Sequence, residues 1–299
     1  MFDETLQSAA YQMLVPQIVG DWWTIATNPD LGEFSGTGQQ PMDFSIWRAA
    51  DGGWQLGACV RGTACGGKGR LLWRWQSDSL DNEHWESAGL LLQANTDVGE
   101  TLGGLQAPYV FRQGGKYHMF YGDWVNICHA VSDNGKDFVR ELRSDGRSAL
   151  FSEGSSNNTR DPMLFAHDDT FYNYYTGVVD DVGAIYCRTS TDLVSWGPSR
   201  VVSRGGAGGS GPSDAECAFV TKADESENFY LFRWHSDGVT SIFRSDDLLD
   251  FGVDDDDKKI ASLPVEVARI MGTEQGMYIS SLMEDYTGIR LARFEWQMA

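Results

Sequence analysis

The hydrophobic and polar positions along this chain repeat in units of strand length rather than helix length. Four short runs of β-branched and aromatic residues each lead into the same kind of polar turn, which begins with a serine and closes on an aromatic residue. The turns are SDSLDNEHW, SDNGKDF, STDLVSW and SDDLLDF, starting at Ser77, Ser132, Ser190 and Ser245. Any one of them alone would be an ordinary surface turn, but their intervals of 55, 58 and 55 residues indicate a structural period.

A hairpin pattern precedes each of these turns and occurs once more near the C-terminus. In each copy, strand-forming residues flank a short turn rich in Gly, Asp or Asn, which is typical of a β-hairpin. The five segments are DFSIWRAADGGWQLGACV, QAPYVFRQGGKYHMFYG, DPMLFAHDDTFYNYYTG, ECAFVTKADESENFYLFR and VARIMGTEQGMYISSL. Helical periodicity occurs only over residues 4–14, where a short helix is the alternative to extended chain.

Five such units, with four short strands each, account for most of the 299 residues. The pattern therefore predicts an all-β protein, a single-domain five-bladed β-propeller with its functional site at one end of the central channel. We expect residues 25–299 to form the propeller. Residues 1–24 are expected to be an N-terminal segment that packs on the rim or lends a strand to the last blade. The expected blades cover residues 40–95, 105–150, 160–204, 215–258 and 266–296.

The composition excludes several classes of protein. Hydrophobic residues make up 41% of the chain and aromatic residues 12%, so the chain can form a substantial core and is not wholly disordered. No run of 18 apolar residues occurs, and no transmembrane helix is expected. Lys and Arg number 23 against 43 Asp and Glu, a net charge of −20 that repels nucleic acid and anionic membranes. A neutral or cationic small-molecule partner is compatible with this charge, which also serves solubility; the oligomeric state is left open.

The cysteines and the start of the chain bear on its compartment. The five cysteines are scattered, and Cys59 and Cys65 lie six residues apart with no histidine nearby, so zinc-ligand spacing is absent. Free buried thiols in a reducing compartment fit this pattern. The start, MFDETLQSAAYQML, has no basic n-region and no apolar h-region. We therefore expect a cytoplasmic protein, or a secreted one if a leader has been removed.

One column of residues at the head of the predicted inner strands carries the candidate chemistry. We count back 11 residues from the aromatic of each hairpin, or 14 in the fourth unit with its longer turn. The column reads Asp43, Gln106, Asp161, Glu216 and Val267. Carboxylates flanked by strand hydrophobes lose hydration, so each needs a partner or a function. A structural cation in the channel is one such partner, although no DxDxD loop is present; no cofactor is expected.

Three carboxylates from three blades suit the hydrolysis of a glycosidic bond. One carboxylic acid must protonate the leaving oxygen, and a second carboxylate must act across the sugar ring. The acid has to keep its proton near neutrality while the other group stays ionised. A third carboxylate between them separates the two pKa values by like-charge repulsion.

Four short motifs contain the first four residues of this column: MDFSI (42–46), QAP (106–108), TRDP (159–162) and AEC (215–217). In this order and spacing they resemble the five-bladed propeller glycosidases, which include glycoside hydrolase families 32, 43, 62, 68 and 117. RDP and EC resemble the β-fructofuranosidases of family 32, whereas DFSI and AP resemble DPSI and WAP in the arabinanases and xylosidases of family 43. The resemblance covers most of the chain at the level of blades, through motifs of two to five residues.

The resemblance implies a role for each carboxylate. It makes Glu216 the general acid, Asp43 the base or nucleophile, and Asp161 the group that tunes a pKa or stabilises the transition state. Arg160 would bond substrate hydroxyls or fix Asp161 by a charge-assisted bond. Two departures leave the sugar and the stereochemical course open: Phe follows Asp43 where fructosidases have Pro, and Gln106 replaces a Trp of family 43.

Further residues are candidates for binding a substrate. Trp47 and Trp124 are the tryptophans best placed to stack on a sugar, and His235 is the histidine best placed to face the channel. Gln106 belongs to the column described above. The loop 203–214, SRGGAGGSGPSD, has no phosphate-binding motif and is expected to border the site as a flexible segment.

The sequence therefore predicts a glycoside hydrolase acting on a small, neutral, furanosidic oligosaccharide. A glycosyltransferase or phosphorylase on the same fold is one alternative. A phosphorylase should carry several Arg and Lys around the channel mouth, and the sequence offers few. The other alternative is a sugar-binding propeller without catalysis, which the presence of all three acids disfavours.

Overall fold

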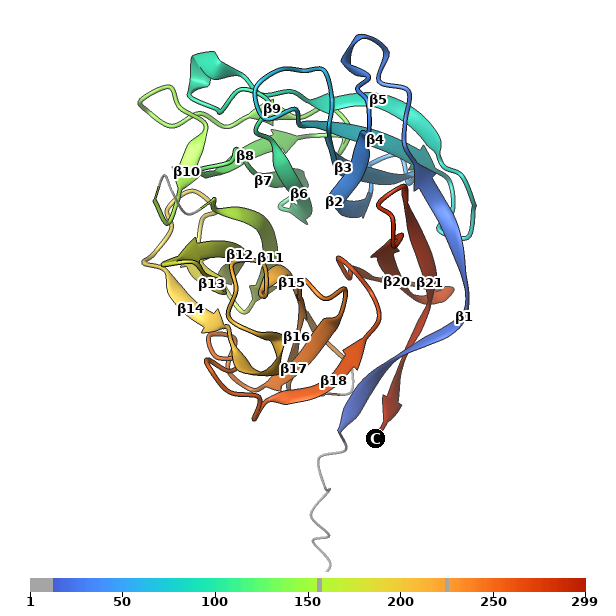
Figure 1. Cartoon of the computed structure of the whole chain (residues 1–299), viewed down its shortest axis with the longest axis vertical. Helices are drawn as coiled ribbons and strands as arrows, with labels where there is room; N and C mark the ends of the chain where they lie inside the picture. The colour runs from blue at the N-terminus through green and yellow to red at the C-terminus, as the bar shows by residue number, and fades with distance from the viewer. Residues whose placement is uncertain (1–12, 155–157, 224–225) are drawn as a thin grey trace, which may run out of the picture.

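The computed structural model describes residues 13–154, 158–223 and 226–299. These residues form five antiparallel sheets set around a central channel, and the predicted five-bladed β-propeller is confirmed (Figure 1). The described part of the chain contains no α-helix, only three 3₁₀ turns at Gly32–Phe34, Thr96–Val98 and Gly206–Gly208. Among the described residues no helix is long and apolar enough to cross a membrane.

The blades follow one another along the chain. Blade 1 contains β2 (Gln40–Arg48), β3 (Trp54–Arg61), β4 (Leu71–Ser77) and β5 (Glu86–Leu92). Blade 2 contains β6 (Gln106–Gln113), β7 (Lys116–Gly122), β8 (Ile127–Ser132), β9 (Val139–Arg140) and β10 (Ala149–Phe151). Blade 3 contains β11 (Arg160–His167), β12 (Thr170–Val179), β13 (Val182–Ser190) and β14 (Arg200–Ser203). Blade 4 contains β15 (Glu216–Lys222), β16 (Phe229–Trp234), β17 (Thr240–Ser245) and β18 (Lys259–Leu263). Blade 5 contains β19 (Ile270–Thr273), β20 (Gly276–Leu282), β21 (Gly288–Met298) and β1 (Leu14–Thr27).

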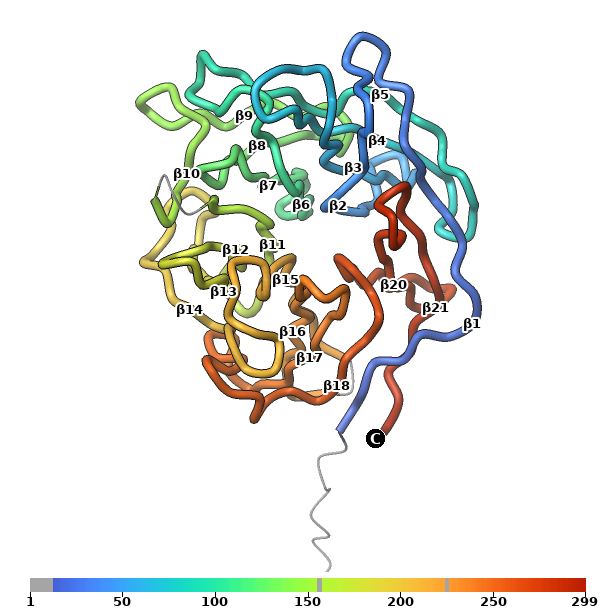
Figure 2. The backbone as a smooth tube through the Cα atoms, viewed as in Figure 1, coloured from blue at the N-terminus to red at the C-terminus, as the bar shows by residue number. Residues whose placement is uncertain are grey.

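The fifth blade joins the two ends of the described chain. Strand β1 lies antiparallel to β21, in a register that runs from Leu14 opposite Met298 to Thr27 opposite Gly288. The blue and red ends of the trace therefore run side by side in Figure 2. This pairing ties the first strand to the last and closes the ring of blades. Residues 1–12, with most of the segment considered for a short helix, lie outside the described residues.

The repeated serine turns close the third strand of each of the first four blades. In the second and third of them the serine hydroxyl accepts a backbone N–H: Gly135 N donates to Ser132 Oγ and Leu193 N to Ser190 Oγ, both at 2.9 Å. The aromatic that ends the turn packs inward, and Phe251 is fully buried. The 55-residue period of the sequence is therefore the spacing of equivalent turns on neighbouring blades.

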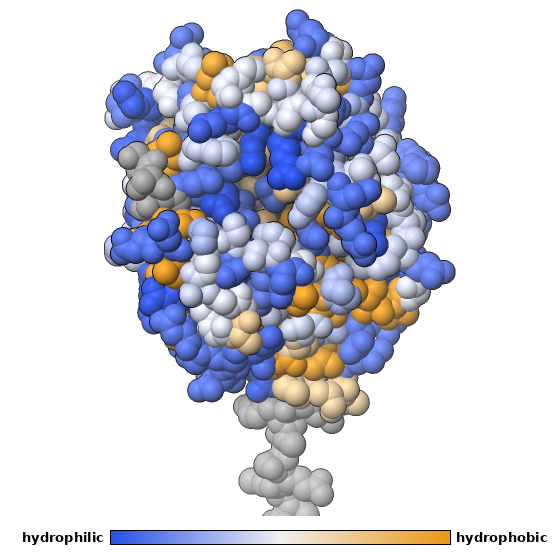
Figure 3. Space-filling model, in the orientation of Figure 1, coloured by the Kyte–Doolittle hydropathy of each residue, from blue (hydrophilic) through white to orange (hydrophobic). Residues whose placement is uncertain are grey.

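Apolar side chains between neighbouring sheets form the core, so the inner strands are held rigidly around the channel. The face shown in Figure 3 is mostly hydrophilic and is hollowed near its centre, where the channel opens. A rigid ring of strand ends around a polar opening is suited to hold side chains from several blades in fixed positions.

Candidate active site

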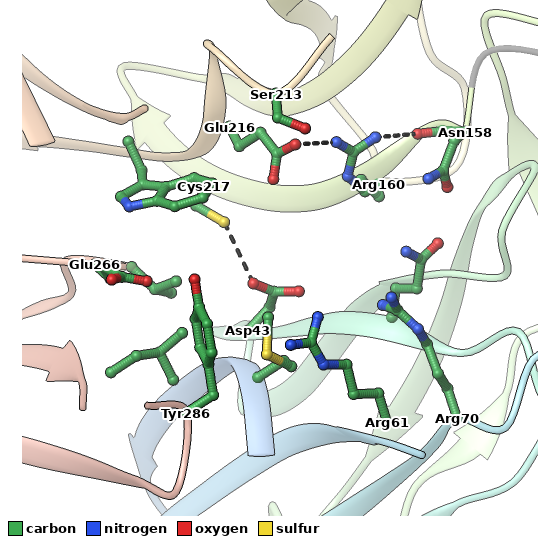
Figure 4. Close-up of a pocket in the computed structure, with 15 residues that line it drawn as sticks. Asp43, Arg61, Arg70, Asn158, Arg160, Ser213, Glu216, Cys217, Glu266 and Tyr286 are labelled. Carbon is green, nitrogen blue, oxygen red and sulfur yellow. Dashed lines mark hydrogen bonds and ion pairs between the residues drawn. The ribbon is translucent and has the colours of Figure 1, made fainter. Parts of the chain in front are cut away.

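The channel mouth holds a cavity of about 280 Å³ that receives side chains from all five blades (Figure 4). Its polar lining is dominated by charged groups. The lining residues are Met42, Asp43, Arg61, Arg70, Gln106, Asn158, Arg160, Ser213, Glu216, Cys217, Trp234, Glu266, Val267, Leu282 and Tyr286. Asp43 and Glu216 are among them, and the third predicted acid, Asp161, is buried beside Asp43 without lining the cavity.

A β-bulge at the head of each inner strand in blades 1 to 4 positions these groups. In β11 the partners of β12 shift between Arg160 and Met163, so Asp161 and Pro162 together oppose one residue of β12. The same shift occurs in β2, β6 and β15. A bulge bends the strand and re-aims its side chains, which is why bulges are common beside active sites. The bulge residues Asp161 and Cys217 have φ of 56° and 53°, a strained conformation for residues other than glycine.

The bulges correct the column expected from the sequence. Counting from the hairpin aromatic put Asp43, Asp161 and Glu216 at equivalent positions. The strand pairing shows instead that Glu216 precedes its bulge, Asp161 is the first bulge residue and Asp43 the second. The count failed because the hairpin aromatics lie at different registers: Tyr117 pairs with Arg112, five residues beyond the first bulge residue Ala107, whereas Tyr172 pairs with Phe165, only four beyond Asp161.

Asp43 and Asp161 approach each other closely at the base of the cavity. One oxygen of each and the sulfur of Cys217 all lie within 4.8 Å of one another. The Cys217 thiol donates a hydrogen bond to Asp43 Oδ1 at 3.4 Å. Burial raises the pKa of the thiol well above its ordinary value, with Asp161 and Asp43 adding to the effect, so Cys217 stays protonated and can keep donating.

Arg160 links the other two carboxylates. Its guanidinium is ion-paired with Glu216 Oε1, and its Nε lies 3.6 Å from Asp161 Oδ2. A third contact runs from Arg160 to the backbone oxygen of Asn158 at 3.0 Å. Burial works against the charge of Arg160, but Glu216 and Asp161 outweigh it and hold its pKa above its ordinary value. Arg160 is therefore a permanent cation between two acids.

The carboxyl groups have perturbed acidities. Burial raises the pKa of Glu216 to about 7; Arg160 opposes the shift, while Asp161 and Asp43 add to it. Burial, reinforced by the negative charge of Asp43, also raises the pKa of Asp161 against the opposing Arg160. Neither oxygen of Asp161 accepts a hydrogen bond from the described residues. The cavity thus holds at least one carboxyl group that keeps a proton near neutral pH, which is the requirement for a general acid.

Some of the predicted substrate-binding residues line the cavity, and others lie outside it. Gln106 lines the cavity, and its buried Oε1 accepts no hydrogen bond from a described residue. Trp47 is buried elsewhere, donates to Gly135 O at 2.7 Å and packs on Phe138. Trp124 lies behind the lining residue Arg70, with the guanidinium carbon 5.1 Å from its ring centroid.

The remaining candidate, His235, is buried and does not line the cavity. It sits under the glycine-rich loop, where a Cβ on Gly208 would lie 2.4 Å from its ring. The neighbouring Trp234, opposite Glu216 in the strand pairing, reaches the cavity in its place.

Sequence reasoning missed several residues of the lining. Arg61 and Arg70 stand at the two ends of one glycine-rich loop, and Tyr286 and Glu266 come from the loops of blade 5. The arginines had a signal in the sequence, because a loop that leaves the second strand of a blade opens on the same end of the channel as the first strand's head. The same signal applied to Tyr286, whose loop leaves β20, the second strand of blade 5, whereas Glu266 lies on the connection from β18 to β19.

Asp43, Asp161 and Cys217 have the ligand types of a metal site, with one ligand atom from each within 4.8 Å of the others. They supply two carboxylate oxygens and one sulfur, whereas calcium takes six to eight oxygen ligands.

No protein-family model matches the chain, and no curated protein matches it in sequence. Solved structures match most of its length. Zg3597, a family 117 glycoside hydrolase of the marine bacterium Zobellia galactanivorans, has a TM-score of 0.63 at 12% identity over 96% of this chain and 91% of its own. The GH43_1 enzyme of Xanthomonas citri, complexed with xylotriose, has a TM-score of 0.62 at 16% identity over 91% and 90%. The family 32 β-fructofuranosidase BmSUC1 of Bombyx mori has a TM-score of 0.62 at 14% identity over 90% of this chain and 61% of its own. At these identities the likeness establishes the fold, which is the five-bladed propeller that these glycoside hydrolase families share.

Proposed function

We propose that this protein is a glycoside hydrolase whose reaction takes place in the cavity at the channel mouth. The observation that carries the proposal is that Asp43 and Glu216, from two different blades, line one cavity, while Asp161 of a third blade lies close to Asp43 and to Arg160, the partner of Glu216. Two of these acids have raised pKa values. The fold supports the proposal, since the similar solved structures include glycoside hydrolases of three families.

Glu216 takes the part of the general acid. Arg160 holds its Oε1, while Oε2 has no hydrogen bond to a described residue. One oxygen therefore fixes the orientation of the carboxyl group and the other can deliver a proton to the leaving oxygen. A pKa of about 7 leaves roughly half of the groups protonated at neutral pH.

Asp43 takes the part of the base or the nucleophile. The Cys217 thiol orients it through the hydrogen bond to Oδ1. Asp161 lies close to Asp43 and to Arg160, and its charge raises the pKa of Glu216 and stabilises positive charge on the sugar ring. Arg160 keeps Asp161 and Glu216 in place and can also bond a sugar hydroxyl.

The substrate in this proposal is a small oligosaccharide, and the xylotriose bound by the similar Xanthomonas citri enzyme supports that class. The buried Oε1 of Gln106 gives one reason to expect a hydroxyl there, because an unpaired buried acceptor gains a partner when a sugar hydroxyl donates to it. The cavity volume of about 280 Å³ suits one ring held deeply and the rest of the chain outside. A furanosidic ring remains the hypothesis from the sequence motifs.

The test is the hydrolysis of aryl fructosides, arabinosides, xylosides and galactosides by the wild type and by Asp43→Asn. One of these sugars should be released by the wild type, and the variant should retain less than about a thousandth of that rate. The exposed Asp246→Asn is the matched control and should be unaffected. Substantial turnover by Asp43→Asn on the same sugar would remove Asp43 from the reaction.

A further inference from the structure

The cavity contains more positive charge than hydrolysis of a neutral sugar requires. Three arginines line it, in a protein whose acidic residues outnumber its basic ones by 43 to 23. Arg160 is paired with Glu216 and Asp161. Among the described residues, Arg61 and Arg70 have no carboxylate within 4.0 Å of their side-chain nitrogens. Two guanidinium groups therefore face the cavity without a counter-charge.

Neutral groups hold both arginines in place. Arg61 donates from Nε and from one terminal nitrogen to Gln40 Oε1, at 2.9 and 2.6 Å, and its guanidinium carbon lies 5.2 Å from the ring centroid of Tyr286. Arg70 lies over the ring of Trp124. These contacts fix the direction of each guanidinium but leave its charge unmatched. Trp124 itself has φ of 83°, which is rare for a bulky residue and common at functional positions.

The loop between the two arginines is built to be rigid. Arg61 ends β3 and Arg70 immediately precedes β4, so the pair stands at the neck of one loop. Arg70 N donates to Gly103 O at 2.9 Å. The loop packs against residues 102–104 so closely that a Cβ on Gly67 would lie 1.9 Å from Leu102 O. The backbone that carries Arg70 therefore cannot move away from the cavity without breaking this contact.

We infer that Arg61 and Arg70 form a subsite for an oxyanion beside the catalytic carboxyl groups. The inference rests on the proposed function and changes its substrate class, because the neutral sugar expected from the net charge would leave both arginines unused. Guanidinium groups bind carboxylate, sulfate and phosphate through paired hydrogen bonds. In Figure 4 the two groups lie on one side of the cavity and the acidic Glu266 on the opposite side, so an anion is directed to the arginine side.

A purely electrostatic role is the competing explanation. In that explanation the two cations would balance the negative charge of the neighbouring carboxyl groups and would bind no ligand. Neither arginine forms an ion pair with Asp43, and the carboxylate already accepts a hydrogen bond from Cys217. The two explanations differ in the ligand that they require, so a binding experiment separates them without any turnover.

The experiment compares inorganic sulfate with chloride at equal ionic strength, by calorimetric titration and by the midpoint of thermal unfolding. It uses the wild type, Arg61→Gln, Arg70→Gln and, as a control for loss of one positive charge, the exposed Arg200→Gln. Sulfate should bind the wild type and the control equally, and each cavity variant should lose about tenfold or more in affinity. Equal sulfate binding by all four proteins, or none by the wild type, would overturn the inference.

Non-specific stabilisation by sulfate and a variant that fails to fold are both distinguishable from loss of the subsite. General stabilisation by sulfate acts on all four proteins alike, so only the difference between them counts. If Arg70→Gln fails to fold, Arg61→Gln carries the test, since Arg61 lies outside the part of the loop that packs against residues 102–104. Because sulfate binding needs no catalysis, its failure and the failure of hydrolysis are separate outcomes.

The source of the anion is then decided by product analysis on the wild type. If the anion belongs to the substrate, oligosaccharides that carry a uronate or a sulfate ester are cleaved faster than their neutral counterparts, and Arg61→Gln removes that preference. If the anion is free phosphate, cleavage depends on phosphate. A phosphate oxygen then attacks the anomeric carbon, Glu216 gives its proton to the leaving oxygen, and the products are a glycosyl phosphate and the free alcohol. Equal rates in both comparisons would overturn the subsite as part of the reaction.

Discussion

The raised pKa of Glu216 makes a prediction about folding that does not depend on knowing the substrate. In the unfolded chain this carboxyl group titrates at its ordinary value of 4.5, whereas in the folded protein it titrates at about 7. Between these two values the folded protein holds a proton that the unfolded chain has released. The free energy of unfolding therefore falls as the pH rises through this window, at about 1.36 kcal/mol per pH unit, or about 3 kcal/mol in all.

The perturbation is Glu216→Gln, which removes the titrating group and nearly keeps its shape. Urea unfolding of the wild type and the variant is measured from about pH 4.5 to about pH 8. The difference between their free energies of unfolding should change by about 3 kcal/mol. As the pH rises, the wild type should become less stable relative to the variant. The difference should level off towards pH 8, about one unit above the folded-state pKa, because the group is then largely ionised in both states.

Taking the difference between two proteins cancels the titrating groups that do not interact with Glu216, including the general repulsion of a chain with net charge −20. The exposed Glu274→Gln is the control and should follow the wild type at every pH. Parallel curves for the wild type and Glu216→Gln would refute the reasoning, since they would mean that folding leaves the acidity of Glu216 unchanged.

Two further predictions concern groups around the acid. Arg160→Gln removes the cation that opposes the raised pKa of Glu216. The basic limb of the pH dependence of kcat/KM should therefore move up by about one pH unit or more. A basic limb that stays in place would show that Glu216 does not control it. Gly67→Ala brings a Cβ within 1.9 Å of Leu102 O and should lower the free energy of unfolding by about 1–3 kcal/mol, as measured by thermal unfolding. Gly146 also has a positive φ but open space around it, so Gly146→Ala should lower the free energy of unfolding by less. Equal losses of stability in the two variants would argue against the close packing of this loop on residues 102–104.

The repeat in the sequence was sufficient to predict the fold. Ser77, Ser132, Ser190 and Ser245 end the third strands of four blades, and their spacing reports the size of a blade directly. These turns can be recognised in the sequence because each combines a serine, whose hydroxyl accepts backbone N–H groups, with an aromatic residue that packs inward where the chain passes to the next blade.

The positions of the three acids relative to the bulges of their strands could not be predicted from the sequence. The same β-bulge occurs at the head of each of these strands, but the hairpin aromatics lie at different registers relative to it, so the offset between Asp43, Asp161 and Glu216 appears only in the strand pairing. Trp47 and His235 show the same limit, because a residue near the end of an inner strand can point into the core or into the channel. Arg61 and Arg70 were overlooked because the count covered only the heads of the first strands, whereas these arginines flank the loop between the second and third strands of blade 1.

The central claim is that Glu216 gives a proton to the leaving oxygen of a glycoside, and one measurement tests it most directly. On the sugar that the wild type releases, kcat/KM is measured for Glu216→Gln and the wild type with an alkyl leaving group and with a dinitrophenyl leaving group. The variant should lose about a hundredfold to ten-thousandfold on the alkyl glycoside and less than about tenfold on the activated one, which leaves without protonation. Equal losses on both glycosides would contradict the claim.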